Sequence, residues 1–139
     1  MDGDRDSGPL SGATIDISAE GGFAVQAVTH HVDHDTRAFA FSQRQLCGAT
    51  CGAPSDSAAG TLAASTADSV FNVVLEQARS LRKDDYGITR HGADMMTYTI
   101  RLASSGRVRT IRGDDGSLPE AARTLVTTVY TAISTARAR

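Results

Sequence analysis

The sequence has no tryptophan and few aromatic residues of any kind, which make up 5% of its 139 residues. Its core must therefore be packed mainly by alanine, valine, isoleucine and leucine. A single domain of this length buries about two-thirds of its unfolded surface, which is enough for a core without covalent cross-links. Only two cysteines are present, too few for a disulfide-dense secreted scaffold.

Charge of one sign and long apolar runs are also missing. The formal net charge is -2, so nothing in the composition favours binding to nucleic acid or to an anionic membrane. No apolar run approaches the ~18 residues that a membrane span needs. The first nine residues are polar and mostly acidic, unlike a signal peptide. We therefore expect a cytoplasmic protein with neither nucleic acid nor membrane as its partner.

Motifs that announce catalysis are absent as well. The sequence has no P-loop, no GxGxxG after a predicted strand and no HExxH. Asp94 and the pair Asp114 and Asp115 have no carboxylate partner at a spacing typical of acid–base catalysis. We expect a protein that is not an enzyme and that needs no cofactor.

The N-terminal half predicts strands around a glycine turn. Residues 1–12 are rich in Asp, Gly and Ser, which favours a disordered tail, and residues 13–139 are predicted to form one domain. Alternating apolar residues over 15–19 and 23–28 flank Gly21 and Gly22, a pattern typical of a β-hairpin. Phe39 and Phe41 predict a third strand over 36–42. The segment at about 43–65 is rich in Gly, Ala, Ser and Thr and is predicted to be a flexible insertion.

The C-terminal half predicts two helices around a second hairpin. Apolar residues at three- and four-residue spacings predict a helix over 66–82, capped by Ser65 or Thr66. Alternation over 96–102 and a return over 107–112 predict a hairpin, with a bulge because Val108 and Ile111 do not share a face. Ser117, Pro119 and Glu120 resemble a capping box at the start of the last helix.

The predicted order is β-β-(β)-α-β-β-α. Such an order is typical of an α+β fold in which an antiparallel sheet of two hairpins, with four or five strands, packs against two helices.

A run of imidazoles and carboxylates after the first hairpin is a candidate zinc site. The side chains concerned are His30, His31, Asp33 and His34. Part of this run is similar to the HxHxDH metal motif of metallo-β-lactamases, but Thr29 stands where that motif has its first histidine, and the chain is too short for that fold. The interpretation that we favour is a polar loop between strands without a metal.

Two further groups of residues allow alternative interpretations. Cys47 and Cys51 form a CxxxC, which we interpret as two free loop thiols, while a local disulfide or thiol chemistry stays open. Four arginines occupy the second predicted hairpin, at positions 101, 107, 109 and 112. They are able to contact phosphates, but the carboxylates nearby favour a solvated strand face.

Several short motifs resemble the emfourin family of protein inhibitors in their order along the chain. They are the Gly21–Gly22–Phe23–Ala24 turn after alternating isoleucines, Gly92–Ala93–Asp94 with Tyr98–Thr99–Ile100, the turn at Gly106, the return strand 107–112 and Asp115–Gly116–Ser117–Leu118–Pro119. The resemblance covers residues 13–28 and 66–134. The stretch 30–65 and the two cysteines depart from the family pattern.

This resemblance implies a proteinaceous inhibitor of a thermolysin-like, protealysin-type zinc metallopeptidase. The hairpin turn is the candidate partner-binding segment, with residues Glu20, Gly21, Gly22 and Phe23. Phe23 is either an exposed anchor for the peptidase cleft or a core residue. The alternative functions are a non-inhibitory protein-interaction domain and, third, a small metal- or thiol-dependent protein.

Overall fold

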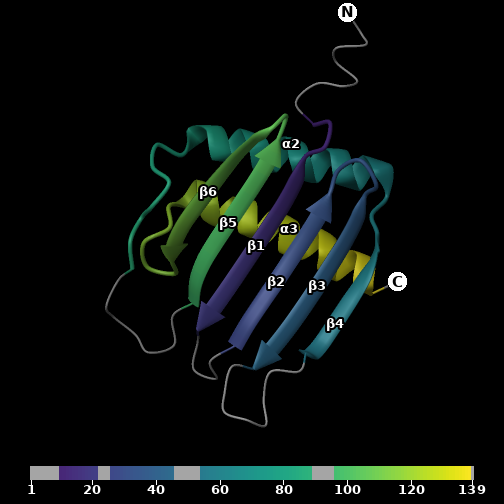
Figure 1. The fold of residues 1–139 in the computed structure, drawn as a ribbon, viewed down its shortest axis with the longest axis horizontal. Helices are drawn as coiled ribbons and strands as arrows, with labels where there is room; N and C mark the ends of the chain where they lie inside the picture. The colour runs from purple at the N-terminus through teal and green to yellow at the C-terminus, as the bar shows by residue number, and fades with distance from the viewer. Residues whose placement is uncertain (1–9, 22–25, 46–53, 89–95, 139) are drawn as a thin grey trace, which may run out of the picture.

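The computed structural model describes residues 10–21, 26–45, 54–88 and 96–138. These residues form one antiparallel sheet of six strands and two helices (Figure 1). In chain order the elements are β1 (Thr14–Gly21), β2 (Gln26–Asp33), β3 (Ala38–Gln45), β4 (Pro54–Thr61), α2 (Ala64–Ser80), β5 (Met96–Ser104), β6 (Arg107–Asp114) and α3 (Glu120–Arg137). The predicted α+β class, with an antiparallel sheet against two helices, is confirmed, but the sheet has six strands and not the four or five predicted.

The strand order in space is β4-β3-β2-β1-β5-β6, so the first strand lies inside the sheet. β1 pairs with β2 on one side and with β5 on the other, and its last residue, Gly21, lies opposite both Gln26 and Met96. Both helices cross the same face of the sheet behind the strands (Figure 1). The end of β1 is therefore held by hydrogen-bonded neighbours on two sides.

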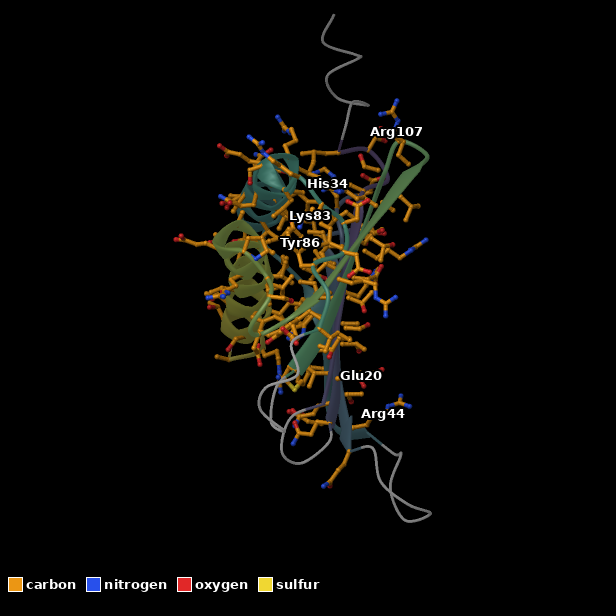
Figure 2. All side chains as sticks on the ribbon, turned by 90° about the vertical axis from the view of Figure 1, so that its left-hand side faces the viewer. Glu20, His34, Arg44, Lys83, Tyr86 and Arg107 are labelled. Atoms are coloured by element: carbon orange, nitrogen blue, oxygen red, sulfur yellow. The ribbon has the colours of Figure 1, made fainter. Side chains whose placement is uncertain are left out.

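The core lies between the sheet and the helices, because alternate side chains of each strand point to the helical face. Ile15 and Ile17 of β1 are almost wholly buried, as is Ile100 of β5. From the helices, Phe71 and Val129 are fully buried against them. The other sheet face carries small and polar residues, and no described element covers it; Figure 2 shows the sheet edge-on with the helices on one side.

The segment predicted to be an insertion contains a strand. Residues Pro54–Thr61 form β4, which pairs with β3 at the edge of the sheet. Leu62, which follows it, is buried at 2% exposure. Residues 46–53 lie outside the described residues, so the flexible insertion predicted over 43–65 is wrong at least from residue 54 onward. Residues 1–9 of the predicted tail lie outside the described residues, whereas Gly12 is tied to the fold, because its amide donates to Asp35 Oδ2 at 2.9 Å.

The predicted helix caps are absent. α2 begins after Ala63 and α3 after Pro119, in both cases without a side-chain cap. Ser117, predicted to cap the last helix, instead accepts a hydrogen bond from the Asp114 amide at 2.8 Å through its Oγ and donates to the Gly87 carbonyl at 2.8 Å. Its hydroxyl therefore fixes the turn before the helix.

The predicted bulge in the second hairpin is also absent. β5 and β6 pair without a register shift from Thr97 opposite Asp114 to Ser104 opposite Arg107. Val108 keeps to the regular alternation and lies 55% exposed, while Ile111 is buried. Within the described residues, neither helix is long and apolar enough to cross a bilayer.

Candidate functional site at the Glu20 end of the sheet

The end of β1 is the site that the sequence predicted for partner binding. Glu20 is exposed, and Gly21 adopts a φ of +114°, a backbone conformation that favours glycine. Figure 2 shows Glu20, with Arg44, at the end of the sheet that reaches past the two helices. Gly22 and Phe23, the other two residues of the predicted site, lie outside the described residues.

A shallow hollow of about 220 Å³ adjoins Glu20 on the uncovered face of the sheet. Three strands line it, and the lining residues are Ser18, Glu20, Thr97, Thr99 and Arg112. The register explains this grouping, because Ser18 lies opposite Thr99, and Thr99 lies opposite Arg112. The floor is thus made of hydroxyl groups between one carboxylate and one guanidinium.

The two charged groups of this hollow belong to Glu20 and Arg112. Neither the Glu20 carboxylate nor the Arg112 guanidinium has a hydrogen-bond or ion-pair partner among the described residues. Both side chains belong to exposed residues. A hollow of this kind can accept hydrogen bonds from, and donate them to, a polar segment of another molecule.

A second hollow, of about 300 Å³, lies at the same end on the helical side of the sheet. Its lining joins β5 to the start of α3 and consists of Tyr98, Asp115, Leu118, Arg123, Val126 and Thr127. Burial, the negative charge of Asp115 and a hydrogen bond to that carboxylate raise the pKa of Tyr98 to about 12. The phenol therefore stays protonated at neutral pH and serves as a hydrogen-bond donor.

The turn that carries Asp115 is fixed by its neighbours. Asp115 Oδ2 accepts a hydrogen bond from the Met96 amide at 2.9 Å, which ties the turn to the start of β5. The buried carboxylate of Asp114 accepts hydrogen bonds from the amides of Gly116 and Ser117, each at 2.9 Å. These bonds make this end of the sheet rigid on the helical side as well.

The candidate zinc ligands are spread over two faces of β2 and the turn after it. His30 points into the core, where its ring stacks on Tyr130 with 4.0 Å between centroids. His31 lies on the opposite face, and its Nδ1 is 2.6 Å from Asp16 Oδ1. Within the described part of the chain, no group of three or more His, Cys, Asp or Glu side chains is arranged to hold a metal ion.

The other two members of this run serve the turn between β2 and β3. The Asp33 carboxylate accepts a hydrogen bond from the Thr36 amide at 3.1 Å, and His34 Nε2 lies 3.1 Å from Asp68 Oδ1 on α2. The run is therefore divided between a strand and a turn, not gathered in one loop. Cys47 and Cys51 lie outside the described residues.

The four arginines of the second hairpin are also separated by the sheet. Arg109 points to the helical side and donates to carbonyls at the end of α2, among them Leu81 O at 3.0 Å. Arg101 lies on the uncovered face, 4.0 Å from Asp16 Oδ2. The structure does not gather these guanidinium groups into one phosphate-binding patch.

The hollow around Tyr98 was not predicted as a site. The sequence does predict that Tyr98 faces the helices, because it alternates with Thr97 and Thr99, which face the other side. No pattern in the sequence, however, brings Arg123 of α3 beside Asp115. A larger groove of about 640 Å³ along α3 is lined mainly by threonine and alanine and carries one charged side chain, Arg123. Its lining therefore offers hydroxyl and methyl groups and a single charge.

No protein-family model matches this chain, and no curated protein matches it.

Proposed function

We propose that this protein binds and blocks a thermolysin-like zinc metallopeptidase through the Glu20 end of its sheet. The observation that carries the proposal is the Glu20 carboxylate. It is exposed, has no partner among the described residues and stands at the end of a strand that is paired on both sides. The sequence resemblance to emfourins supports the class of target.

A rigid projection suits the inhibition of such an enzyme. A catalytic zinc has three protein ligands and one open position, and a carboxylate is among the groups that bind zinc. A segment already fixed by the sheet loses little conformational entropy when it enters a cleft. Glu20 would approach the metal or the cleft polar groups, and Phe23, at the same turn of the sequence, would supply an apolar side chain.

The side chains that line the two hollows would contact the rim of the peptidase cleft. On the uncovered face, the hydroxyls of Thr97 and Thr99 would hydrogen-bond to the peptidase backbone. On the helical side, the Tyr98 phenol, whose proton is donated to Asp115, would accept a hydrogen bond from the peptidase through its oxygen. A polar rim around one or two anchoring side chains is the usual anatomy of a protein–protein interface.

The test is a titration of active thermolysin-like peptidase with the purified protein, followed by cleavage of a fluorogenic peptide. We expect a linear loss of rate that ends near equal stoichiometry. Glu20→Gln and Phe23→Ala should each weaken binding by about 2 kcal/mol, as interface anchors do. Glu76→Gln, the same change on the exposed face of α2, is the control and should inhibit like wild type.

Two results would overturn different parts of this proposal. If large excess over several thermolysin-like enzymes leaves the rate unchanged, the protein is not such an inhibitor, and a non-inhibitory interaction domain becomes the better interpretation. If the protein inhibits but both Glu20→Gln and Phe23→Ala inhibit like wild type, the function stands and the contact surface lies elsewhere. A thermal midpoint for each variant separates a lost contact from lost folding.

A further inference from the structure

Among the described residues, the outer edge of β6 has backbone hydrogen-bonding groups without a partner. In an antiparallel pair, the backbone groups of alternate residues point away from the partner strand. Arg112 is one of these residues, because its amide donates to Asp84 O at 2.7 Å and its carbonyl accepts from the Tyr86 amide at 2.8 Å, both outside the sheet. By the two-residue period, the amides and carbonyls of Val108 and Thr110 point outward too.

A short segment of the chain already lies along this edge and forms a single β-bridge with it. Residues 84–86 run beside Arg112 and form a parallel bridge from Asp85 to Arg112. Val108 and Thr110 lie further along the same edge, and no described residue hydrogen-bonds to their outward backbone groups. Figure 2 looks onto this edge, with Tyr86 and Lys83 toward its middle and Arg107 near its far end.

A groove runs beside this open stretch, between β6 and α2. Its volume is about 880 Å³, and its lining residues are Leu75, Ala78, Arg79, Leu102, Ser104, Ser105, Arg107, Val108 and Arg109. The apolar part of the lining comes from both layers of the fold, since Leu75 belongs to α2 and Leu102 to β5. Val108 is, at 55% exposure, one of the two large hydrophobic residues most exposed in the described chain.

The groove is positively charged. Arg79 and Arg107 are exposed, and neither forms an ion pair with another described residue. The third guanidinium, that of Arg109, is already occupied by Asp84 at 2.8 Å. Two uncompensated positive charges beside an apolar floor favour a partner that brings both carboxylates and apolar side chains.

We propose that the Val108–Thr110 edge is a docking site for an extended, acidic segment of a partner protein, which adds to the sheet as a further strand. Its backbone would hydrogen-bond to Val108 and Thr110. Side chains of an added strand alternate between two faces. One set would therefore enter the groove over Leu75 and Leu102, with carboxylates on Arg79 and Arg107.

A peptide fits these groups better than nucleic acid does. The edge offers alternating amide donors and carbonyl acceptors, and a peptide backbone satisfies both kinds. Phosphate groups carry no donor for the carbonyls of Val108 and Thr110, and they gain nothing from the apolar floor. This site lies on β6, away from the Glu20 turn, and its occupation does not depend on the proposed inhibition.

The test uses a fluorescein-labelled peptide of alternating valine and glutamate, about eight residues long like a strand, with fluorescence anisotropy as the readout. The control peptide replaces glutamate with lysine. We expect the acidic peptide to bind and the basic one not to. Arg79→Glu with Arg107→Glu should weaken binding by at least about tenfold, whereas Arg44→Glu, a single charge reversal on β3, should leave it unchanged.

Two further measurements locate the bound peptide. Thr110→Pro removes an outward amide that makes no bond to β5, and we expect it to abolish binding while Thr110→Ala retains it. In the wild-type protein, hydrogen exchange at the Val108 and Thr110 amides should slow when the peptide is added. If Thr110→Pro does not fold, the arginine variants and the exchange rates still show whether the peptide binds at this edge.

Several outcomes would overturn the proposal. They are equal binding of the two peptides, wild-type affinity in the double arginine variant, and exchange rates at Val108 and Thr110 that the peptide does not change. Tighter binding of single-stranded oligothymidylate than of the acidic peptide, lost in the same arginine variant, would assign the groove to nucleic acid instead.

Discussion

His30 occupies a core position that a hydrophobic residue usually holds. It is only 6% exposed, and its ring meets Phe41 edge-on at 5.0 Å as well as stacking on Tyr130. Its Nδ1 is buried without a hydrogen-bond partner among the described residues. The neighbouring cation, Arg137, lies 4.2 Å above the Phe41 ring and pairs with Asp56. The surroundings favour the neutral imidazole.

Stability should therefore fall in mild acid. Burial, and then the charge of Arg137, lower the pKa of His30 from 6.5 to about 4. Between these two values the unfolded chain binds a proton that the folded protein does not, so the free energy of unfolding decreases as pH falls from about 6.5 to about 4. The loss amounts to at most about 3 kcal/mol and levels off below that range.

Urea unfolding of wild type and His30→Phe between pH 7 and 4 measures this effect. Phenylalanine keeps the stacking and does not titrate, so the variant should lose less stability with acid than wild type. Every other side chain is the same in both proteins, so its contribution cancels in the comparison. Identical pH dependence in the two proteins would show that His30 is not the cause.

Gly113 is required by the packing of the turn after β6. A Cβ at this position would lie 2.6 Å from Leu118 Cδ2 and 3.0 Å from Ser117 Oγ. Leu118 is buried and has little room to move. Gly113→Ala should therefore cost about 1–3 kcal/mol, as overpacked core positions do, measured by chemical denaturation. The cost should shrink in a Leu118→Ala background, and an unchanged cost there would point to backbone strain instead.

Some residues of the candidate site could be predicted from the sequence alone, and others could not. Glu20 and Gly21 could be singled out because a glycine pair between alternating runs predicts a turn. The run His30–His34 misled in part, since a strand period sends His30 and His31 to opposite faces, and this follows only once β2 is known to extend through Asp33. That Asp115 and Arg123 line one hollow depends on how the last helix crosses the sheet, which no local pattern encodes.

At the scale of elements, β4 is the strand that the sequence pattern did not predict. Its helix-facing positions are Asp56, Ala58 and Gly60. None of them is a large apolar residue, so the segment lacks the alternation that predicts a buried strand. The structure supplies the reason at Gly60, where an added Cβ would lie 2.9 Å from Phe39 Cε2. The large side chain on β3 fills the space, and β4 is left with small residues. The helices and the other strands were predictable because their apolar side chains recur at the helix or strand period and face the core.

The end of α2 is held by a side chain from another element. Arg109 of β6 donates to the carbonyl of Ala78 in the last turn of the helix and to those of Leu81 and Lys83 just beyond it. Arg109→Ala should lower the free energy of unfolding by about 1.5–3 kcal/mol, the worth of charged hydrogen bonds.

Lysine at position 109 separates charge from geometry. A guanidinium reaches several acceptors at once, and a single ammonium does not, so Arg109→Lys should recover less than half of the loss in urea unfolding. Arg82→Ala, a neighbouring exposed arginine without an ion-pair partner in the described chain, should change stability by less than about 0.5 kcal/mol. Full recovery with lysine would mean that charge alone stabilises the helix end.

At the scale of the molecule, one continuous core joins all the layers. Buried residues of the strands, both helices and Leu62 belong to a single cluster. We therefore expect folding to need neither a metal nor a disulfide. A chelator should leave the thermal midpoint unchanged, and Cys47→Ser with Cys51→Ser should change stability by less than about 1 kcal/mol. Unfolding by the chelator, or a much larger loss in the double variant, would contradict this expectation.

The two edges of the sheet differ in how they resist self-association. An exposed edge strand is a template for pairing with another chain unless charges or covering segments block it. β6 has arginines and the added segment 84–86, whereas on β4 Ser57 and Ala59 are exposed and Asp56 is tied to Arg137. Heated or concentrated protein should therefore aggregate edge to edge through β4. Ala59→Lys should reduce light scattering on heating and leave the melting temperature unchanged. Such a result would mean that the exposed residues of this edge set the solubility of the protein, while the core sets its stability.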